Sequence, residues 1–195
     1  MSKTQKNAEE KCKAIVLAAK DLFLDQGYAV TSMDTIAQTS GVTKQTVYRY
    51  YPSKEDLFAA VMQNIRKSEY TSYQFSNSSL EEELFLYGSQ LLAFHLQSET
   101  LGLYRLMITE GSQNHNLLHT FRSNGPRNFL EPLCHFLKTY CSSHNDADFT
   151  ANMFCNMILS PRNGILMGHS PTFGKTKQNR HVRRVVEFTL IALRK

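Results

Sequence analysis

The stretch that decides the fold runs from Gly41 to Leu57 and reads GVTKQTVYRYYPSKEDL. Gly41 suits the turn that ends one short helix, and the Thr43 hydroxyl can cap the next. In that next helix Val47 falls on the inner side with Tyr51, and Pro52 ends the helix because the residue before a proline disfavours helical geometry. The outward side carries polar and aromatic groups: Lys44, Gln45, Thr46, Tyr48 and Tyr50.

Helical patterns continue on both sides of this stretch. Apolar residues recur at the spacing of one helix face over residues 15–23, and Gly27 suits the end of that helix. A short helix follows Ser32, and Ser53 with Asp56 resembles a capping box at the start of a fourth. Further helices are predicted over residues 79–94, 98–107, 126–137, 146–159 and 179–193. No alternating strand pattern of useful length occurs, so the predicted fold class is all-α.

Length and composition predict a globular chain with a buried core, since 42% of its 195 residues are hydrophobic. No apolar run approaches the roughly 18 residues that span a bilayer, and the polar start MSKTQKNAEEK has no hydrophobic signal core. We therefore expect a cytoplasmic protein. Its four cysteines form no CxxC pair, and we expect them to be reduced, buried or half-buried thiols.

Charge is distributed unevenly along the chain, whose net charge is +5. Lys and Arg outnumber Asp and Glu by 10 to 7 in residues 1–67 and by 8 to 1 in residues 162–195. The acids lead by 9 to 4 in residues 68–161. An anionic partner would therefore meet the basic ends first.

Two short helices joined by a glycine turn, with a longer helix before them, are what a helix-turn-helix requires. Residues 35–54 contain Lys44, Arg49 and Lys54 and no Asp or Glu, which suits a surface pressed against phosphate. The ordered motif TSMDTIAQTSGVTKQTVYRYYPSKEDLF, together with AAKDLFLDQGY before it, resembles the DNA-binding signature of the TetR family of transcriptional regulators. The stretch LYRLMITEGSQNHNLLHTFRSNGPRNFLEPLCHFL resembles that family's AefR-like regulatory domain.

The resemblance implies a three-helix helix-turn-helix domain over residues 1–67 and a helical-bundle domain for effector binding and dimerisation over residues 68–195. It implies a homodimer that binds a palindromic operator in double-stranded DNA, as a repressor, and is released by a small effector. The mostly apolar residues expected around that effector favour a mostly hydrophobic one. Similarity assigns base reading to Lys44, Gln45 and Thr46, because Gln pairs with adenine edges and Lys with guanine. The predicted phosphate contacts, made by side chains or by backbone N–H groups at helix starts, are Thr31, Ser32, Thr43, Tyr48, Tyr50 and Lys54.

The regulatory part carries two predicted sites. The effector is expected among aromatic, thioether and imidazole groups in the helices where the family keeps its pocket: Phe94, His95, Tyr104, Met107 and Phe129. The dimer interface is expected on the last two helices, at Met153, Met157, Val185, Phe188 and Ile191. Residues 160–163 read Ser-Pro-Arg-Asn where the AefR-like domain usually runs apolar, which leaves open how far the penultimate helix, predicted over residues 146–159, extends.

Other classes of function fit the sequence less well. His115 and His119 have the spacing of zinc ligands on a helix, but HNLLH lacks a catalytic glutamate and a third ligand. No nucleophilic triad, phosphate loop or dinucleotide fingerprint occurs, and we expect neither enzyme activity, nor a cofactor, nor a metal. The alternatives left open are a constitutive regulator without an effector and a sensor that depends on a thiol or a metal.

Overall fold

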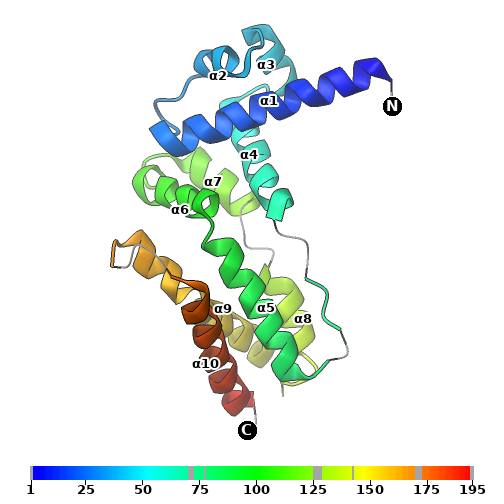
Figure 1. The fold of residues 1–195 in the computed structure, drawn as a ribbon, viewed down its shortest axis with the longest axis vertical. Coiled ribbons are helices and arrows are strands. Elements are labelled where there is room, and N and C mark those ends of the chain that lie inside the picture. The colour runs from blue at the N-terminus through cyan, green and yellow to red at the C-terminus, as the bar shows by residue number, and fades with distance from the viewer. Residues whose placement is uncertain are drawn as a thin grey trace. The chain divides into compact units, whose positions relative to one another are not determined.

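The computed structural model describes residues 2–69, 73–76, 78–124, 129–141, 143–169 and 173–193. Throughout these ranges the regular secondary structure is helical, which confirms the all-α prediction (Figure 1). The helices are α1 (Lys3–Gln26), α2 (Met33–Ser40), α3 (Lys44–Tyr50), α4 (Lys54–Glu69), α5 (Leu80–His95), α6 (Ser98–Glu110), α7 (His115–Asn124), α8 (Leu130–Leu137), α9 (His144–Leu166) and α10 (Lys175–Leu193).

The chain packs into two compact units, and the boundary between them falls inside α6. The first unit comprises residues 1–69 and 102–125, and the second comprises residues 70–101 and 126–195. The predicted division of roles after residue 67 concerns binding and stays a prediction. Packing, however, places most of α6 and all of α7 with the N-terminal helices.

The first unit is built around an aromatic cluster that joins α1 to α4. The rings of Phe23, Tyr28 and Phe58 lie with centroids 5.2 to 5.7 Å apart, and all three side chains are buried. Leu106 of α6 and Leu117 of α7 belong to the same core. The helices of the predicted helix-turn-helix therefore rest on a core that later parts of the sequence complete.

The sequence pattern predicted no helix where α7 lies, although Asn114 Oδ1 accepts a hydrogen bond from the Leu117 N–H at its start, 3.0 Å away. Few apolar residues mark this helix, and its buried side is supplied by packing on α4. The hydrophobic pattern of α7 is too weak to predict a helix, because the helix is stabilised mainly by tertiary contacts.

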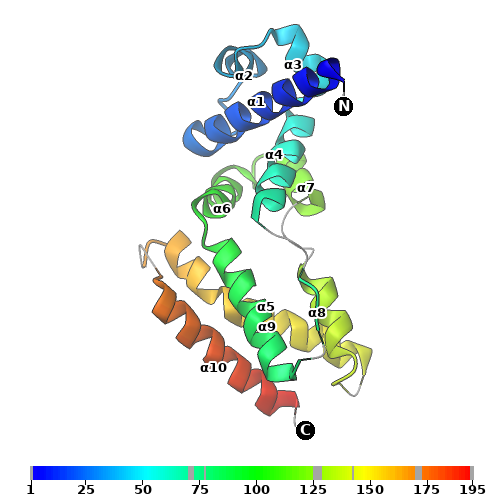
Figure 2. The ribbon, with the colours of Figure 1, turned by 45° about the vertical axis from the view of Figure 1, so that its right-hand side comes forward.

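The second unit contains α5, α8, α9 and α10 (Figure 2). Gly88 lets α5 approach its neighbours closely, because a Cβ atom there would lie 3.0 Å from Ile158 Cδ1 and 3.2 Å from Val182 Cγ1. Tyr87 and Phe154 are fully buried around this contact. A glycine at this position therefore fixes how tightly α5 packs on α9 and α10.

Helix α9 continues to Leu166, so the predicted range, which ends at residue 159, is too short. Pro161 lies inside the helix and has no N–H to donate to the carbonyl of Met157, four residues earlier. His181 of α10 replaces that donor, with Nε2 2.9 Å from the Met157 oxygen and 3.3 Å from the Ile158 oxygen. A side chain from the neighbouring helix thus satisfies the carbonyl that the proline leaves open.

Candidate nucleic-acid interface

The turn between α2 and α3 has the geometry predicted from its glycine. Gly41 adopts φ 69° and ψ 23°, the left-handed conformation that ends α2, and its N–H donates to the Ala37 carbonyl. Ser32 caps α2 by accepting the Thr35 N–H at 3.0 Å, and Thr43 caps α3 by accepting the Thr46 N–H at 3.2 Å. Both short helices are therefore stabilised at their starts by side chains of the sequence motif.

Helix α3 has one buried side chain and a polar outer surface. Val47 is fully buried, while Lys44, Gln45 and Arg49 are exposed and Tyr48 is 42% exposed. Thr46 is half-buried, and its hydroxyl lies 2.9 Å from that of Thr43. The residues predicted to read bases therefore share one accessible surface.

An ion pair restrains the first of these side chains. Lys44 Nζ lies 2.7 and 3.0 Å from the two carboxylate oxygens of Asp34, which stands in the first turn of α2. The hydrogen bond to Asp34 and its negative charge raise the pKa of Lys44. Because both side chains are exposed, this pairing is weak enough for another anion to replace it. The sequence pattern did not indicate that Asp34 would pair with Lys44 and so compete with DNA for its ammonium group.

The two tyrosines of α3 differ in their surroundings. Tyr50 is half-buried against the core of the first unit, and Arg49 donates to its hydroxyl at 3.3 Å while the guanidinium lies 4.9 Å from the ring centroid. Tyr48 is more exposed, with the Lys44 ammonium 6.0 Å from its ring centroid. Arg49, which sequence reasoning counted only for its charge, therefore belongs to the same surface.

Two predicted phosphate contacts have other partners in the fold. Thr31 is 1% exposed, and its hydroxyl donates to the Gly27 carbonyl at 2.7 Å, so this side chain already has a partner inside the fold and its phosphate contact stays a prediction. The Lys54 ammonium donates to the carbonyls of Tyr28 and Thr31 at 2.7 and 2.9 Å, with Ala29 O at 3.4 Å. A phosphate contact from Lys54 would have to replace one of these three, since an ammonium has three donors.

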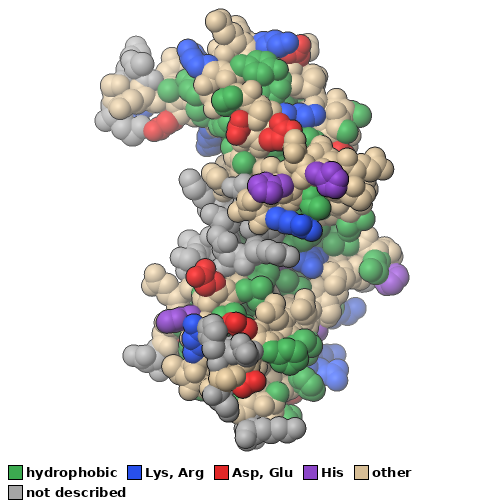
Figure 3. Space-filling model, turned by 180° about the vertical axis from the view of Figure 1, so that it is seen from behind, with side chains coloured by type: hydrophobic (Ala, Val, Ile, Leu, Met, Phe, Trp, Pro, Cys, Tyr) green, Lys and Arg blue, Asp and Glu red, His purple; other side chains and the backbone are tan. Residues whose placement is uncertain are grey.

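Charge is mixed on the face of the molecule drawn in Figure 3. Basic and acidic side chains of the N-terminal part, at the top of that view, are interspersed among apolar ones. The absence of acidic residues from position 35 to position 54 is therefore local to the helix-turn-helix. It does not extend to a surface of uniform positive charge over the whole unit.

Two family models match separate parts of the chain. Residues 15–61 match the model described as bacterial regulatory proteins, tetR family, and residues 82–194 match the AefR-like transcriptional repressor, C-terminal domain. The chain belongs to the TetR family. The second match covers more than half of the chain, and the first spans the helix-turn-helix described above.

Similarity to two curated relatives covers about a third of the chain. The transcriptional regulator RutR of Escherichia coli K12 is 40% identical over 63 residues, 32% of this chain and 30% of its own length. The transcriptional activator FasR of Mycolicibacterium smegmatis is 38% identical over 55 residues, 28% of this chain and 25% of its own. The matches thus span about a quarter to a third of these relatives.

Structural similarity extends over nearly the whole chain. The flavonoid-responsive regulator FrrA superimposes with a TM-score of 0.77 and 28% identity, covering 93% of this chain and 96% of FrrA. The two-part TetR fold therefore applies to the regulatory region as well as to the helix-turn-helix.

The residues predicted to bind an effector in this TetR-family chain divide between the two units. In the second unit the buried His95 ring makes edge-on contacts with Phe94 at 5.3 Å and Phe129 at 5.2 Å. In the first unit Tyr104 contacts Phe121 at 5.7 Å and Met107 packs against the core. Burial, with a smaller contribution from Arg162, lowers the pKa of His95 to about 3, so the imidazole is neutral.

The predicted dimer residues are mostly exposed, as an interface requires. Met153 is 42%, Phe188 62% and Ile191 65% exposed, and Phe149, which the sequence did not single out, is 68% exposed one turn before Met153. Met157 is half-buried and lines a groove of about 470 Å³ between α9 and α10: Asn156, Met157, Ser160, His181, Arg184, Val185 and Phe188. Val185 is only 7% exposed and serves the core of the second unit more than any outer surface.

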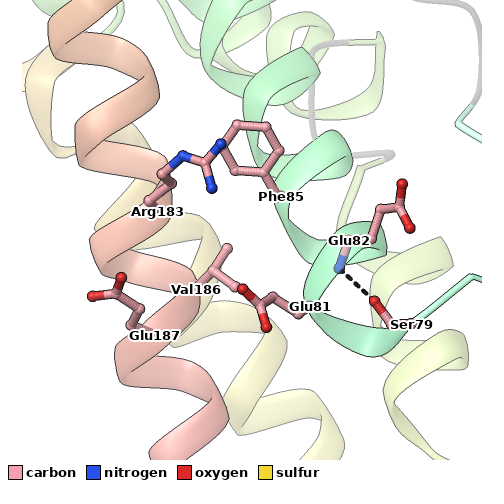
Figure 4. Close-up of a pocket in the computed structure, with 7 residues that line it drawn as sticks. All are labelled: Ser79, Glu81, Glu82, Phe85, Arg183, Val186 and Glu187. Atoms are coloured by element: carbon pink, nitrogen blue, oxygen red, sulfur yellow. Dashed lines mark hydrogen bonds between the residues drawn. The ribbon is translucent and has the colours of Figure 1, made fainter.

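A second hollow, of about 360 Å³, lies where the start of α5 faces α10 (Figure 4). Arg183 covers the Phe85 ring, with the guanidinium carbon 4.7 Å from the ring centroid. Glu81, Glu82 and Glu187 also line the hollow. Charged residues thus share its lining with Phe85 and Val186, whereas a mostly hydrophobic effector would need a predominantly apolar lining.

Two thiols of the second unit, Cys134 and Cys155, have raised pKa values. Burial raises the pKa of Cys155 to about 12, and burial together with the nearby Asp148 raises that of Cys134 to about 11. Thiolate, the reactive form, is thus disfavoured. Within the described residues no three His, Cys, Asp or Glu side chains gather as a metal site, and no helix there is long and apolar enough to cross a membrane.

Proposed function

We propose that the protein is a transcriptional repressor that binds a palindromic DNA operator as a homodimer and is released by a small, mostly hydrophobic effector. The observation that supports DNA binding most strongly is the surface of α3, where exposed Lys44, Gln45 and Arg49 lie together without an acidic neighbour on that helix. Such a surface fits a major groove, which accepts a single helix between two phosphate backbones. A role on DNA also agrees with the expected cytoplasmic location.

Roles on the operator follow from the exposure of each side chain. Gln45 is exposed and its amide is suited to read adenine, while Lys44 would exchange Asp34 for a guanine edge or a phosphate. Tyr48 and Tyr50 present hydroxyls that would position the helix on phosphates, as would Ser32 and Thr43 at the helix starts. These contacts give both the readout and the register of the helix.

Dimerisation is supported by the exposed apolar side chains of α9 and α10. Phe149 and Met153 of α9 and Phe188 and Ile191 of α10 are exposed, and exposed large apolar side chains on adjacent helices are typical of protein interfaces. A two-fold dimer would present two α3 helices to half-sites about 34 Å apart, one turn of DNA. The Arg and Lys residues of α10 repel one another across such an axis, so the apolar side chains must supply the affinity.

Effector control is supported by the relatives and by the buried aromatic contacts of the second unit. FrrA is named for its response to flavonoids, and the AefR-like model is described as the C-terminal domain of a transcriptional repressor. FasR, in contrast, is named an activator. Repression, as opposed to activation, therefore rests on the description of the AefR-like model. Phe94, His95 and Phe129 form an aromatic cluster with one polar ring, and a ligand that entered this cluster would meet mostly apolar groups.

DNA binding is tested by fluorescence anisotropy with the DNA upstream of the protein's own gene and with variants of that sequence. Gln45→Ala should reduce the preference for one base, at a single position of the DNA, by roughly 1 to 3 kcal/mol in binding free energy. The order in which the DNA variants bind should then change. Gln113→Ala makes the same chemical change on the exposed α6–α7 turn and should leave the ranking unchanged. An equal loss on every sequence from Gln45→Ala would contradict its role as a base reader.

Dimerisation is tested by analytical ultracentrifugation of Phe188→Glu. This change places a charge in the proposed apolar interface and should shift the protein to monomers at micromolar concentration. Ile108→Glu alters a side chain of matched exposure, 64% against 62%, in the first unit and should leave the dimer intact. A wild-type monomer at that concentration, with or without DNA, would remove the dimer from the proposal.

A further inference from the structure

The turn between α1 and α2, residues 27–32, is held by a carboxylate from a distant part of the sequence. Glu110, the last residue of α6, accepts the Tyr28 N–H on Oε1 at 2.9 Å and the Ala29 N–H on Oε2 at 2.7 Å. Both carboxylate oxygens are therefore used on consecutive backbone donors, an arrangement stronger than hydrogen bonds between neutral groups.

The carbonyls of the same turn are held from the other side by Lys54, the first residue of α4. Its ammonium donates to the Tyr28 and Thr31 oxygens and lies 4.3 Å from the centroid of the Tyr28 ring. Burial lowers the pKa of Lys54, and the charges of Glu55 and Glu110 act in the opposite direction. A carboxylate thus binds the N–H groups of the turn, and an ammonium group binds its C=O groups.

Gly27 shows that the turn is shaped to admit the carboxylate. Its φ of 100° is unfavourable for any residue with a side chain, and a Cβ atom there would lie 2.5 Å from Glu110 Oε1. With a side chain at position 27, the Glu110 carboxylate would have to shift from its present place. Both oxygens of the Glu110 carboxylate accept hydrogen bonds from the turn.

We propose that Glu110 and Lys54 are positioning residues for DNA binding, which clamp the α1–α2 turn so that the end of α6 controls the placement of α2 and α3. The turn leads directly into Ser32, the cap of α2, and α2 packs on α3. A shift of α6 that withdraws the carboxylate leaves two N–H groups without their acceptor and loosens the start of α2. This inference rests on the proposed function, since it concerns the geometry that the operator requires.

The clamp predicts an effect opposite to that of long-range electrostatics. By long-range electrostatics alone, removing a negative charge from any site on the protein should strengthen its binding to DNA. Glu110→Gln should weaken it, because the amide cannot accept from both N–H groups. Glu110→Asp retains the charge but withdraws it by one methylene, so it should weaken binding as well. Glu131→Gln, on the exposed side of α8, is the matched control for charge.

The experiment uses full-length protein, a duplex that the wild type selects from a randomised pool, and a scrambled duplex of the same composition. Both Glu110 variants should bind the selected duplex about tenfold more weakly, as expected for loss of a charge-assisted hydrogen bond. Binding of Glu110→Asp to the scrambled duplex should not change. In hydrogen exchange without DNA, the Tyr28 and Ala29 amides should exchange about tenfold faster.

Unchanged exchange at these two amides overturns the clamp, as does a selected-duplex affinity that stays the same or rises as it does in Glu131→Gln. If the wild type selects no duplex from the pool, the proposed function fails, and the exchange measurement still decides whether the clamp exists. The two failures are therefore distinguishable.

Discussion

Replacing His181 tests how α9 accommodates Pro161. The imidazole Nε2 lies 2.9 Å from the Met157 carbonyl, the acceptor that an ordinary residue at position 161 would satisfy from within the helix. His181→Phe keeps a ring of similar size against Phe173, whose centroid is 5.9 Å from the imidazole, but removes the donor. Loss of a partner for a part-buried carbonyl should cost roughly 1 to 3 kcal/mol in the free energy of unfolding.

The magnitude should depend on the residue at position 161. In the background of Pro161→Ala, the new N–H can donate to the Met157 carbonyl, so the histidine is no longer needed. We therefore expect the loss in the free energy of unfolding caused by His181→Phe to be smaller by at least about 1 kcal/mol in that background than in the wild type. Pro161→Ala alone should stabilise the protein, because proline is a poor residue for a helix interior by about 3 kcal/mol, part of which the stiffer unfolded chain offsets.

The assay is urea unfolding of the four proteins of this double-mutant cycle, followed by circular dichroism at 222 nm and checked by calorimetry. A loss of 1 kcal/mol should also lower the melting temperature by about 2 to 4 °C in a chain of this size. If His181→Phe costs the same in both backgrounds, within the roughly 0.3 to 0.5 kcal/mol expected of independent sites, the account of Pro161 given above is refuted.

Further predictions concern packing, protonation and the α1–α2 turn. Gly88→Ala should lower the free energy of unfolding by about 1 to 3 kcal/mol through overpacking, whereas Gly164→Ala, with no atom within 4 Å of its new Cβ, should be neutral or stabilising in thermal melts. His95 binds a proton far less readily when folded than when unfolded, so the stability it contributes is complete above pH 6.5 and falls as the pH drops toward 3. Urea midpoints measured at pH 7.5 and 5.5 should therefore differ more for the wild type than for His95→Phe, and equal differences would contradict this assignment. Gly27→Ala should lower both stability and affinity for a selected duplex, because the new Cβ strains the turn and displaces Glu110; retention of both would argue against the clamp.

The helix-turn-helix could be predicted almost completely from the sequence because its determinants are local. Gly41, Ser32 and Thr43 act on backbone groups within a few residues, and the spacing of Val47 among polar neighbours is read directly from the chain. The same pattern placed Gln45 and Tyr48 on the outer surface of α3, where the structure exposes them. Local hydrogen bonding and the period of the helix suffice for these conclusions.

Contacts between residues far apart in sequence were decided by the tertiary structure alone. Thr31 looked like a surface cap but is buried, and Lys54 and Glu110, 56 positions apart in the numbering, meet on one turn. Helix α9 passes Pro161 because His181 comes from another helix. The helical character of the chain and its outward-facing α3 were determined by the sequence, since each depends on neighbours within one or two turns. Which polar groups are occupied by partners, and which remain for a ligand, depends on packing, because any buried backbone or charged group takes whatever partner the fold brings within hydrogen-bond distance.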